Sequence, residues 1–260
     1  MTQLSRSILL MVSLVLAACG AARPVVSASR PAALEEAATL VTVRSPNWDA
    51  SSGILERWER AETGWRRLAD PVPVSLGRNG LAWGRGVHGD GAIDALGGGV
   101  KQEGDGRSPA GVFALSRVFG YSDEPPAGTT MSYSVITPSL QCVEDAASDR
   151  YNQILDRAEV TPSWSGTDLM RREDGLYEYV VVVEHNTTSP TSGAGSCVFF
   201  HIWRGEGTPT SGCTAMSRDA LASLIPALSG PSTLLVQLPD AAYSSLAEAW
   251  GLPTVSEIGR

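Results

Sequence analysis

Short apolar runs separated by turn residues cover most of the chain after residue 38. Val, Ile, Tyr and Phe are frequent within the runs, and Gly, Pro, Asn and Asp are frequent between them, which is typical of β-strands joined by turns. The expected strands lie within residues 39–44, 54–59, 71–76, 111–115, 176–183, 196–203 and 232–238. The pattern shows no internal repeat, so it predicts one mainly β domain over residues 39–260.

Two stretches near the C-terminal end have helical periodicity instead. Apolar residues recur at the i, i+3, i+4, i+7 spacing between residues 221 and 228, with Ser217 placed as the N-cap. The same spacing recurs between residues 243 and 250, where Gly251 should end the helix. We therefore expect a few peripheral helices on the β domain.

The N-terminal apolar run, residues 8–18, is too short to cross a bilayer as a helix, which takes about 20 residues. It follows a basic residue and matches the hydrophobic region of a secretory signal. The run ends in LAAC at residues 16–19, which resembles a bacterial lipobox, so Cys19 is the expected lipid-attachment site. This predicts a lipoprotein signal peptide at 1–18 and a lipidated tether at 19–38. The alternative is an ordinary signal peptide with a chance cysteine.

Charge and export narrow the possible partners. The chain carries 20 Lys and Arg against 28 Asp and Glu, a formal net charge of −8, so nucleic acid is not an expected partner. A lipoprotein would be exported and held at the periplasmic face of the cell envelope, which we expect to be the outer membrane, through its N-terminal lipid. Structural thiols tend to pair in such an oxidising compartment.

Candidate catalytic residues concentrate in residues 196–217. A bulky apolar strand carries His201 near its end, a loop rich in Gly and Pro turns the chain back, and Cys213 follows Gly212. A thiol nucleophile needs a base within hydrogen-bond reach, and His201 is the expected base. The backbone N–H groups of Ser211 and Gly212 are the expected oxyanion hole, and a side chain at Gly212 would crowd the turn.

Two sequence blocks resemble the YkuD-type L,D-transpeptidases, which remodel bacterial peptidoglycan with a catalytic Cys and an upstream His. The family motif of His, a spacer and Ser/Thr-x-Gly-Cys matches His201, Thr210, Gly212 and Cys213. The second block, KQEGDGRSPAGVF at residues 101–113, is similar to the family's Gly and (Thr/Ser)-Pro-x-Gly turn before a β-strand. The resemblance covers residues 72–238 and implies a YkuD-like β-sandwich with a cleft at one end.

The resemblance implies a cysteine-dependent acyltransferase acting on peptidoglycan stem peptides. The Cys213 thiolate would attack the carbonyl between an L-centre and a D-residue, form a thioester and pass the acyl group to an acceptor amine, with His201 moving the protons. Transfer to water would instead make the protein an L,D-carboxypeptidase. Arg204 and Thr210 are the expected substrate-binding residues, and no cofactor is expected.

The chain departs from the common family pattern near the nucleophile. Ser211 stands where the family has His before Gly-Cys, and Ala215 stands where it has Arg or Asn. The spacer is also shorter, because Cys213 follows His201 by only twelve positions. The chain would thus be a divergent branch of the family. The departures also motivate the alternative of a cell-wall-binding lipoprotein that has lost catalysis.

The other histidines have simpler interpretations. His185 is a rival base, but a hairpin of residues 177–185 with 197–203 would separate it from His201 by about 13 Å at 3.3 Å per residue. His88 lies in a glycine-rich loop and is expected to be solvated. No metal site is expected, because zinc ligands usually come in close-spaced pairs that this sequence lacks.

The remaining thiols are expected to form a disulfide. Cys142 lies in a polar region interpreted as a surface loop, and Cys197 begins the strand that carries His201. An exported protein meets oxidising conditions in which pairs of cysteines form disulfides. Catalysis requires Cys213 to stay reduced, so Cys142 and Cys197 are the expected partners. The alternative is two buried thiols with apolar neighbours.

Overall fold

The computed structural model describes residues 29–165, 167–228 and 232–254. The expected signal peptide, Cys19 and the first part of the expected tether lie outside these ranges. In the described part of the chain, no helix is long and apolar enough to cross a membrane.

The expected tether is too long at its C-terminal end. Helix α1 (Ala32–Glu36) buries Leu34 completely in the core. The Arg60 side chain donates hydrogen bonds to the backbone oxygens of Leu34 and Ala37, at 2.7 and 2.8 Å. These residues belong to the folded domain because burial of Leu34 adds apolar surface to the core. The sequence did not indicate this, because the segment is rich in Ala and Pro and has no helical periodicity.

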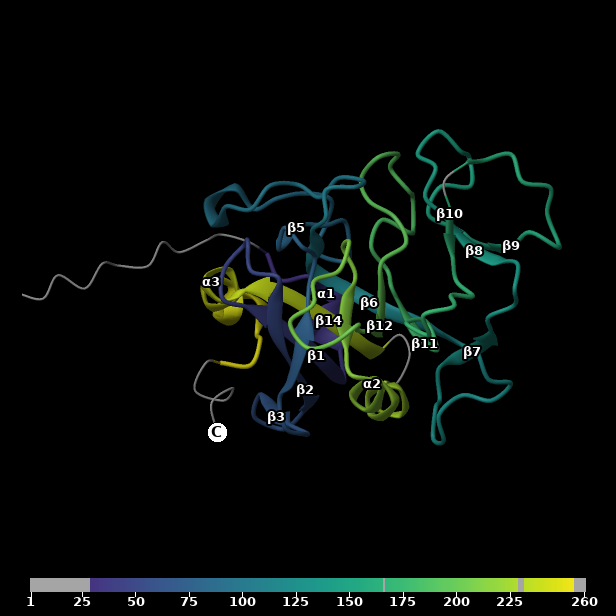
Figure 1. Ribbon diagram of the computed structural model, residues 1–260. Coiled ribbons are helices and arrows are strands. Elements are labelled where there is room, and N and C mark those ends of the chain that lie inside the picture. Colours follow the sequence, from purple (N-terminus) through teal and green to yellow (C-terminus); the bar gives the residue numbers. More distant parts are fainter. Residues whose placement is uncertain (1–28, 166, 229–231, 255–260) are drawn as a thin grey trace, which may run out of the picture.

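Most strands pair in one large sheet whose order closes on itself (Figure 1). The ring runs through β1 (Thr39–Ser45), β14 (Thr233–Pro239), β6 (Ser108–Gly120), β11 (Tyr179–Val183), β12 (Phe199–Ile202), β13 (Thr214–Met216), β4 (Val72–Ser75) and β2 (Ser52–Arg60), and β2 pairs again with β1. Three short strands extend it: β3 (Trp65–Arg67), β5 (Leu81–Trp83) and β7 (Ser132–Val135). Each predicted run contains or overlaps one ring strand, and the mainly β fold is confirmed.

A second, three-stranded sheet consists of β8 (Leu140–Val143), β9 (Ile154–Asp156) and β10 (Thr167–Leu169). Figure 1 shows this small sheet in teal, beside the main sheet. The interpretation of the Cys142 region as a surface loop is wrong, because Cys142 lies in β8 and is 1% exposed. Strands of three or four residues with polar neighbours give too short a pattern to recognise.

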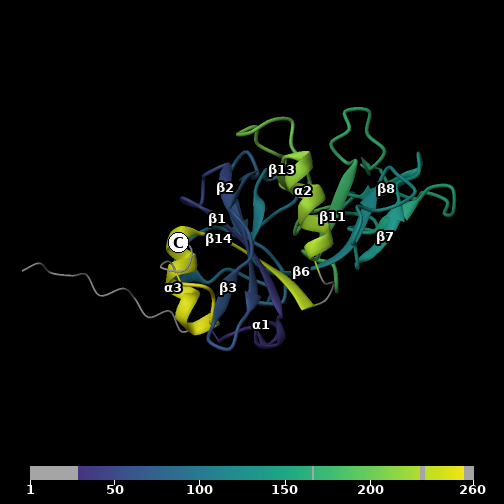
Figure 2. The same ribbon diagram turned by 90° about the horizontal axis from the view of Figure 1, so that it is seen from below.

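Both predicted helices are confirmed. Helix α2 (Arg218–Leu224) begins after Ser217, whose Oγ accepts a hydrogen bond from the Ala220 N–H, and a 3₁₀ turn, η2 (Ile225–Ala227), follows it. Helix α3 (Asp240–Trp250) ends at Gly251, which adopts a left-handed conformation. Figure 2 shows α3 beside β1 and β14, and α2 beside β11. A further 3₁₀ turn, η1 (Asp94–Leu96), interrupts the glycine-rich loop after β5.

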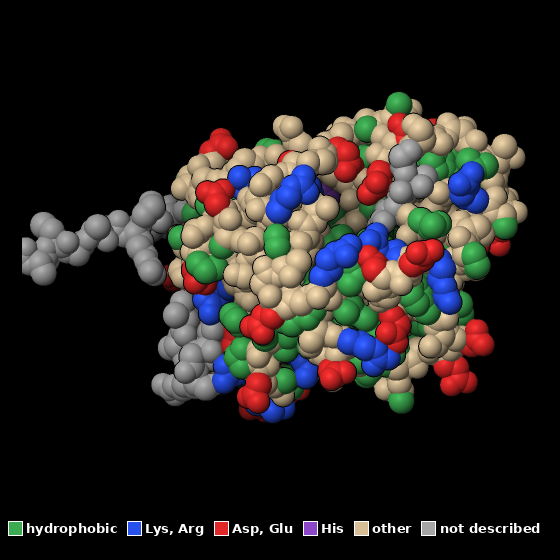
Figure 3. Space-filling model, in the orientation of Figure 1, with side chains coloured by type: hydrophobic (Ala, Val, Ile, Leu, Met, Phe, Trp, Pro, Cys, Tyr) green, Lys and Arg blue, Asp and Glu red, His purple; other side chains and the backbone are tan. Residues whose placement is uncertain are grey.

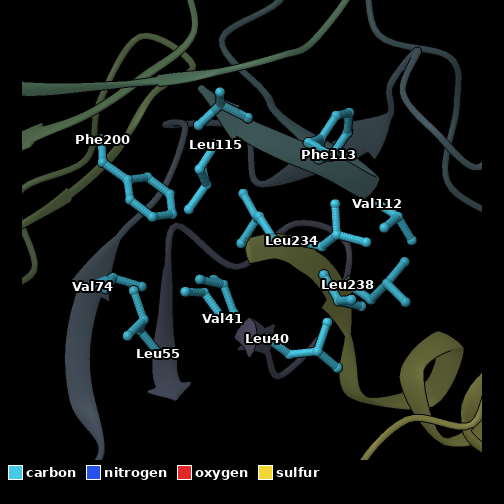
Figure 4. Close-up of a cluster of buried hydrophobic side chains, with 14 of the residues drawn as sticks. Leu40, Val41, Leu55, Val74, Val112, Phe113, Leu115, Phe200, Leu234 and Leu238 are labelled. Carbon is cyan, nitrogen blue, oxygen red and sulfur yellow. The ribbon is translucent and has the colours of Figure 1, made fainter. Parts of the chain in front are cut away.

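Strands far apart in sequence supply the core (Figure 4). The labelled side chains come from β1, β2, β4, β6, β12 and β14: Leu40, Val41, Leu55, Val74, Val112, Phe113, Leu115, Phe200, Leu234 and Leu238. Side chains alternate along a strand, so Phe200 enters this core while Phe199 joins a second cluster with residues of the small sheet. His201 follows Phe200 and therefore faces the same side of β12 as Phe199.

Candidate active site

The fold brings His201 and Cys213 to one cavity of about 270 Å³. His201 lies in β12 and pairs with Ala215 of the parallel neighbour β13. Cys213 directly precedes β13, two positions before Ala215. All three residues line the cavity, so the strand pairing brings the expected nucleophile and the expected base to the same cavity.

A backbone hydrogen bond fixes the tautomer of His201. Its Nδ1 lies 2.8 Å from the Ile202 carbonyl oxygen. A carbonyl oxygen only accepts hydrogen bonds, so Nδ1 carries the proton and Nε2 keeps its lone pair. His201 therefore has the form that a general base requires.

Burial keeps this imidazole neutral. The His201 side chain is only 7% exposed, and burial lowers its pKa to about 4, with Arg172 adding a smaller effect in the same direction. The Tyr177 ring lies 5.3 Å from the imidazole centroid and restricts its orientation. At neutral pH the ring can therefore accept a proton from a thiol.

The two motif blocks meet at the backbone of the nucleophile. The Cys213 carbonyl oxygen accepts hydrogen bonds from Thr210 Oγ1 at 2.6 Å and from Ser108 Oγ at 2.8 Å. Ser108 Oγ also accepts from the Gly77 N–H, at 2.9 Å. The Ser-Pro-x-Gly segment, which begins β6, thus positions the Cys213 loop directly.

We predict that Ser108→Ala destabilises the protein by about 1–3 kcal/mol, because it leaves buried backbone groups of Gly77 and Cys213 with fewer partners. The loosened loop should also slow the reaction of Cys213. Urea unfolding and the acylation rate of the folded protein measure the two effects. Ser116→Ala, on the same strand, is the control and should leave the acylation rate unchanged. Equal acylation rates for both variants would contradict a positioning role for Ser108.

Gly212 is required by the loop geometry. Its φ of +155° is unfavourable for other residues, and a Cβ there would lie 3.1 Å from the Arg107 carbonyl oxygen. Its N–H donates to Thr210 Oγ1 at 3.1 Å, so the expected oxyanion role of Gly212 requires this hydrogen bond to be exchanged for one to the substrate. The exposed Ser211 N–H has no hydrogen-bond acceptor in the described part of the chain and stays available to a substrate.

The expected substrate-binding residues Arg204 and Thr210 both line the cavity. Arg204 is largely exposed and pairs with Asp174 at 3.1 Å. The Thr210 hydroxyl is occupied by the hydrogen bonds that shape the Cys213 loop. Arg204 therefore can reach a substrate, whereas the Thr210 side chain maintains the loop.

The disulfide expected between Cys142 and Cys197 is present, with the Cα atoms 5.8 Å apart. It joins the small sheet to the chain entering β12. Asn152 strengthens the same junction, because its Oδ1 accepts from the Cys197 N–H at 2.8 Å. The Cys213 Sγ lies 3.5 Å from the Cys197 carbonyl oxygen, so the nucleophile contacts this junction.

His185 has a structural role. Its Nδ1 accepts from the Arg85 N–H at 3.1 Å, and its Nε2 donates to the Ala194 carbonyl oxygen at 2.9 Å. Both ring nitrogens are occupied and the side chain is 1% exposed, so it cannot replace His201 as the base.

The expectation that His88 is solvated is wrong. Its ring packs against the rings of Trp83, Phe113 and Trp250. A Cβ on Gly111 would lie 2.1 Å from this ring, so the glycine of the Ser-Pro-x-Gly segment in β6 leaves space for it. The local sequence is polar, and the tertiary packing buries the ring.

Cys213 lies where two cavities meet. The second, of about 370 Å³, extends past Lys101, Glu103 and Glu144. Lys101 is 5% exposed and donates to Asp105 at 2.6 Å, so its charge is partnered. A nucleophile between two cavities can contact two substrates in turn.

The sequence reasoning missed several residues that line these cavities: Arg78, Arg172, Tyr177 and Trp203. Arg78, Arg172 and Tyr177 come from loops outside the two motif blocks, whereas Trp203 lies in the spacer of the first block, two residues after His201.

Family models, curated proteins and solved structures were compared with the chain, and none of them matches it. Within the described ranges, no group of three or more His, Cys, Asp or Glu side chains is arranged to hold a metal ion.

Proposed function

We propose that the protein is a peptidoglycan L,D-transpeptidase, a divergent member of the YkuD family, that works through a thioester on Cys213. The observation that carries the proposal is the state of His201: its Nδ1 proton is held by the Ile202 carbonyl, and its free Nε2 lone pair belongs to a cavity lined by Cys213. A neutral, oriented imidazole beside a thiol is the arrangement that nucleophilic catalysis by cysteine requires.

The reaction follows from these groups. Nε2 of His201 removes the thiol proton as Cys213 Sγ attacks the carbonyl between the L-centre and the terminal D-residue. The Ser211 N–H would stabilise the oxyanion. The C–N bond then breaks, the imidazolium donates its proton to the leaving amine, and a thioester remains. An acceptor amine attacks the thioester, His201 takes its proton, and the thiol is restored with a new cross-link.

The two cavities support transfer between peptides. One can hold the donor while the other admits the acceptor, because both reach Cys213. Water in place of the acceptor gives L,D-carboxypeptidase activity. The sandwich fold of the family is part of the proposal. It is supported by the closure of the main sheet on itself, in which the β13–β4 link is a single residue pair.

Export and lipid anchoring are also part of the proposal. The lipobox-like sequence before Cys19 supports them, and so does the Cys142–Cys197 bond, because disulfides persist mainly in oxidising compartments. The protein would then act on the periplasmic side of the envelope, tethered to the outer membrane by its lipid.

The alternative is a cell-wall-binding lipoprotein without turnover. It is favoured by Ala215, which is fully buried and offers no polar group where the family has Arg or Asn. Thiol alkylation separates the two functions: an activated Cys213 reacts faster than a model thiol at mildly acidic pH, and an inert one does not.

Product analysis tests the proposal. The protein is incubated with muropeptides bearing tetrapeptide stems, and the products are separated and weighed. We expect release of the terminal D-residue together with cross-linked dimers or shortened stems. Absence of both products from folded protein would contradict the proposed activity.

A further inference from the structure

Three non-glycine residues of the described ranges have a left-handed backbone, and hydrogen bonds connect them. They are Asn152, Asn186 and Cys197, with φ values of +63°, +56° and +54°. Asn152 Oδ1 accepts from the Cys197 N–H, and Asn152 Nδ2 donates to the Asn186 carbonyl oxygen, both at 2.8 Å. Asparagine adopts this conformation more readily than most residues, whereas it is uncommon for cysteine. Neighbouring groups must therefore hold Cys197 in it.

The Asn152 side chain has one possible orientation. Its Nδ2 lies 2.9 and 2.8 Å from the carbonyl oxygens of His185 and Asn186. These oxygens only accept hydrogen bonds, so the amide nitrogen must face them and Oδ1 must face the Cys197 N–H. The disulfide to Cys142 holds the side chain of Cys197 in the same way. Cys197 is thus fixed through both its backbone and its side chain.

The conformation of Cys197 directs its carbonyl oxygen at the nucleophile. This oxygen lies 3.5 Å from Cys213 Sγ, a length that a hydrogen bond from sulfur allows, and the bond restricts rotation of the thiol. The base is also held below the surface, because His201 is buried and Figure 3 shows only a trace of histidine on the face in view. The reacting groups are therefore positioned from the interior, and a shift of Cys197 would move Sγ.

We propose that Asn152 is a positioning residue for the proposed transpeptidation: by holding Cys197 in its left-handed conformation, it keeps Cys213 Sγ oriented toward the donor carbonyl. Asn152 lines neither of the two cavities that contain Cys213, so it acts through Cys197 and does not touch the donor. It lines a different cavity, together with Cys142, on the other side of the disulfide. This inference rests on the proposed function.

Asn152→Gly tests the role, because glycine keeps the left-handed backbone and removes only the side chain. Acylation of Cys213 is followed at several concentrations of a synthetic donor tetrapeptide, which gives a maximal rate and a half-saturating concentration. We expect the maximal rate to fall about 10- to 100-fold, since a small displacement of a reacting atom costs this much. The half-saturating concentration should stay at the wild-type value. Ser139→Ala is the matched control, because it removes a side-chain hydrogen bond to Asp156 within the small sheet and should keep the wild-type rate.

Asn152→Asp separates positioning from stability. It keeps an acceptor for the Cys197 N–H and loses both hydrogen bonds that Nδ2 donates. The melting temperature should therefore fall while the maximal acylation rate stays close to that of the wild type. A merely structural residue would instead make the rate follow the melting temperature. Disulfide mapping by mass spectrometry should find Cys142 bonded to Cys197 in every variant.

The outcomes separate this inference from the proposed function. A wild-type acylation rate in folded Asn152→Gly, or equal slowing in Asn152→Gly and Asn152→Asp, would overturn the positioning role and leave the proposed function standing. If Asn152→Gly does not fold, Asn152→Asp decides alone, with a wild-type rate supporting the role and a slowed rate overturning it. A folded wild-type protein that the donor does not acylate would overturn both.

Discussion

Replacing His201 with glutamine is expected to slow acylation of Cys213 by about 10²- to 10⁴-fold, the range that general-base catalysis supplies. Glutamine can keep a hydrogen bond to the Ile202 carbonyl, but it has no group that takes a proton from the thiol. Stopped-flow measurement of thioester formation with a donor tetrapeptide gives the rate. His88→Gln is the matched control, because His88 lines neither cavity that contains Cys213. Equal rates in the two variants would exclude His201 as the base.

The pH profile provides a second measure of the same role. The wild-type rate should fall as the pH drops through about 4, where His201 becomes protonated, and this limb should disappear in His201→Gln. Folding must be followed at each pH. Burial lowers the pKa of both His185 and His201 from 6.5 to about 4, so the unfolded chain binds more protons between these values and stability decreases as the pH falls through that window.

Loss of the Cys142–Cys197 disulfide is expected to lower the free energy of unfolding by about 2–4 kcal/mol, because the bond closes a long loop with a sequence separation of 55 in the unfolded chain. Urea unfolding of the Cys142→Ser, Cys197→Ser double variant measures the loss. The parent should carry Cys213→Ser, which prevents thiol exchange with the nucleophile.

Reduction supplies the control for this prediction. Reductant should lower the unfolding midpoint of the Cys213→Ser parent and leave that of the triple serine variant unchanged. The same midpoint for the parent with and without reductant would contradict a stabilising bond. In the otherwise wild-type protein, the double variant should also acylate more slowly, because the junction at Cys197 contacts Cys213.

Most of the main sheet could be predicted because its strands lie in runs of β-branched and aromatic residues that turn residues separate. The run LYEYVVVV contains β11, and the Phe-rich run at residues 196–203 contains β12. The small sheet could not be predicted, since its strands have three or four residues and depend on the disulfide and on contacts distant in sequence. The closure of the ring through β1 and β2 also depends on long-range pairing that no local pattern encodes.

Part of the candidate site could likewise be predicted from the sequence, and part could not. His201 and Cys213 could be found because one motif contains both; His201 lies in β12, and Cys213 directly precedes the adjacent strand β13. Arg78 and Arg172 lie almost a hundred positions apart in loops without a motif, and the topology alone brings them to one cavity. The sequence also contained no sign that the Gly212 N–H, an expected oxyanion donor, makes a hydrogen bond to the Thr210 hydroxyl.

The central claim is that Cys213 becomes acylated by the donor peptide, and intact-protein mass spectrometry tests it most directly. A donor tetrapeptide is added in the absence of acceptor, the reaction is quenched in acid, and the modified residue is located by digestion. We predict a mass increase equal to the acyl group of the donor without its terminal D-residue. The added mass should be located on Cys213 and absent from Cys213→Ser. A folded wild-type protein that gains no mass, or a Cys213→Ser variant that still releases the D-residue at the wild-type rate, would contradict it.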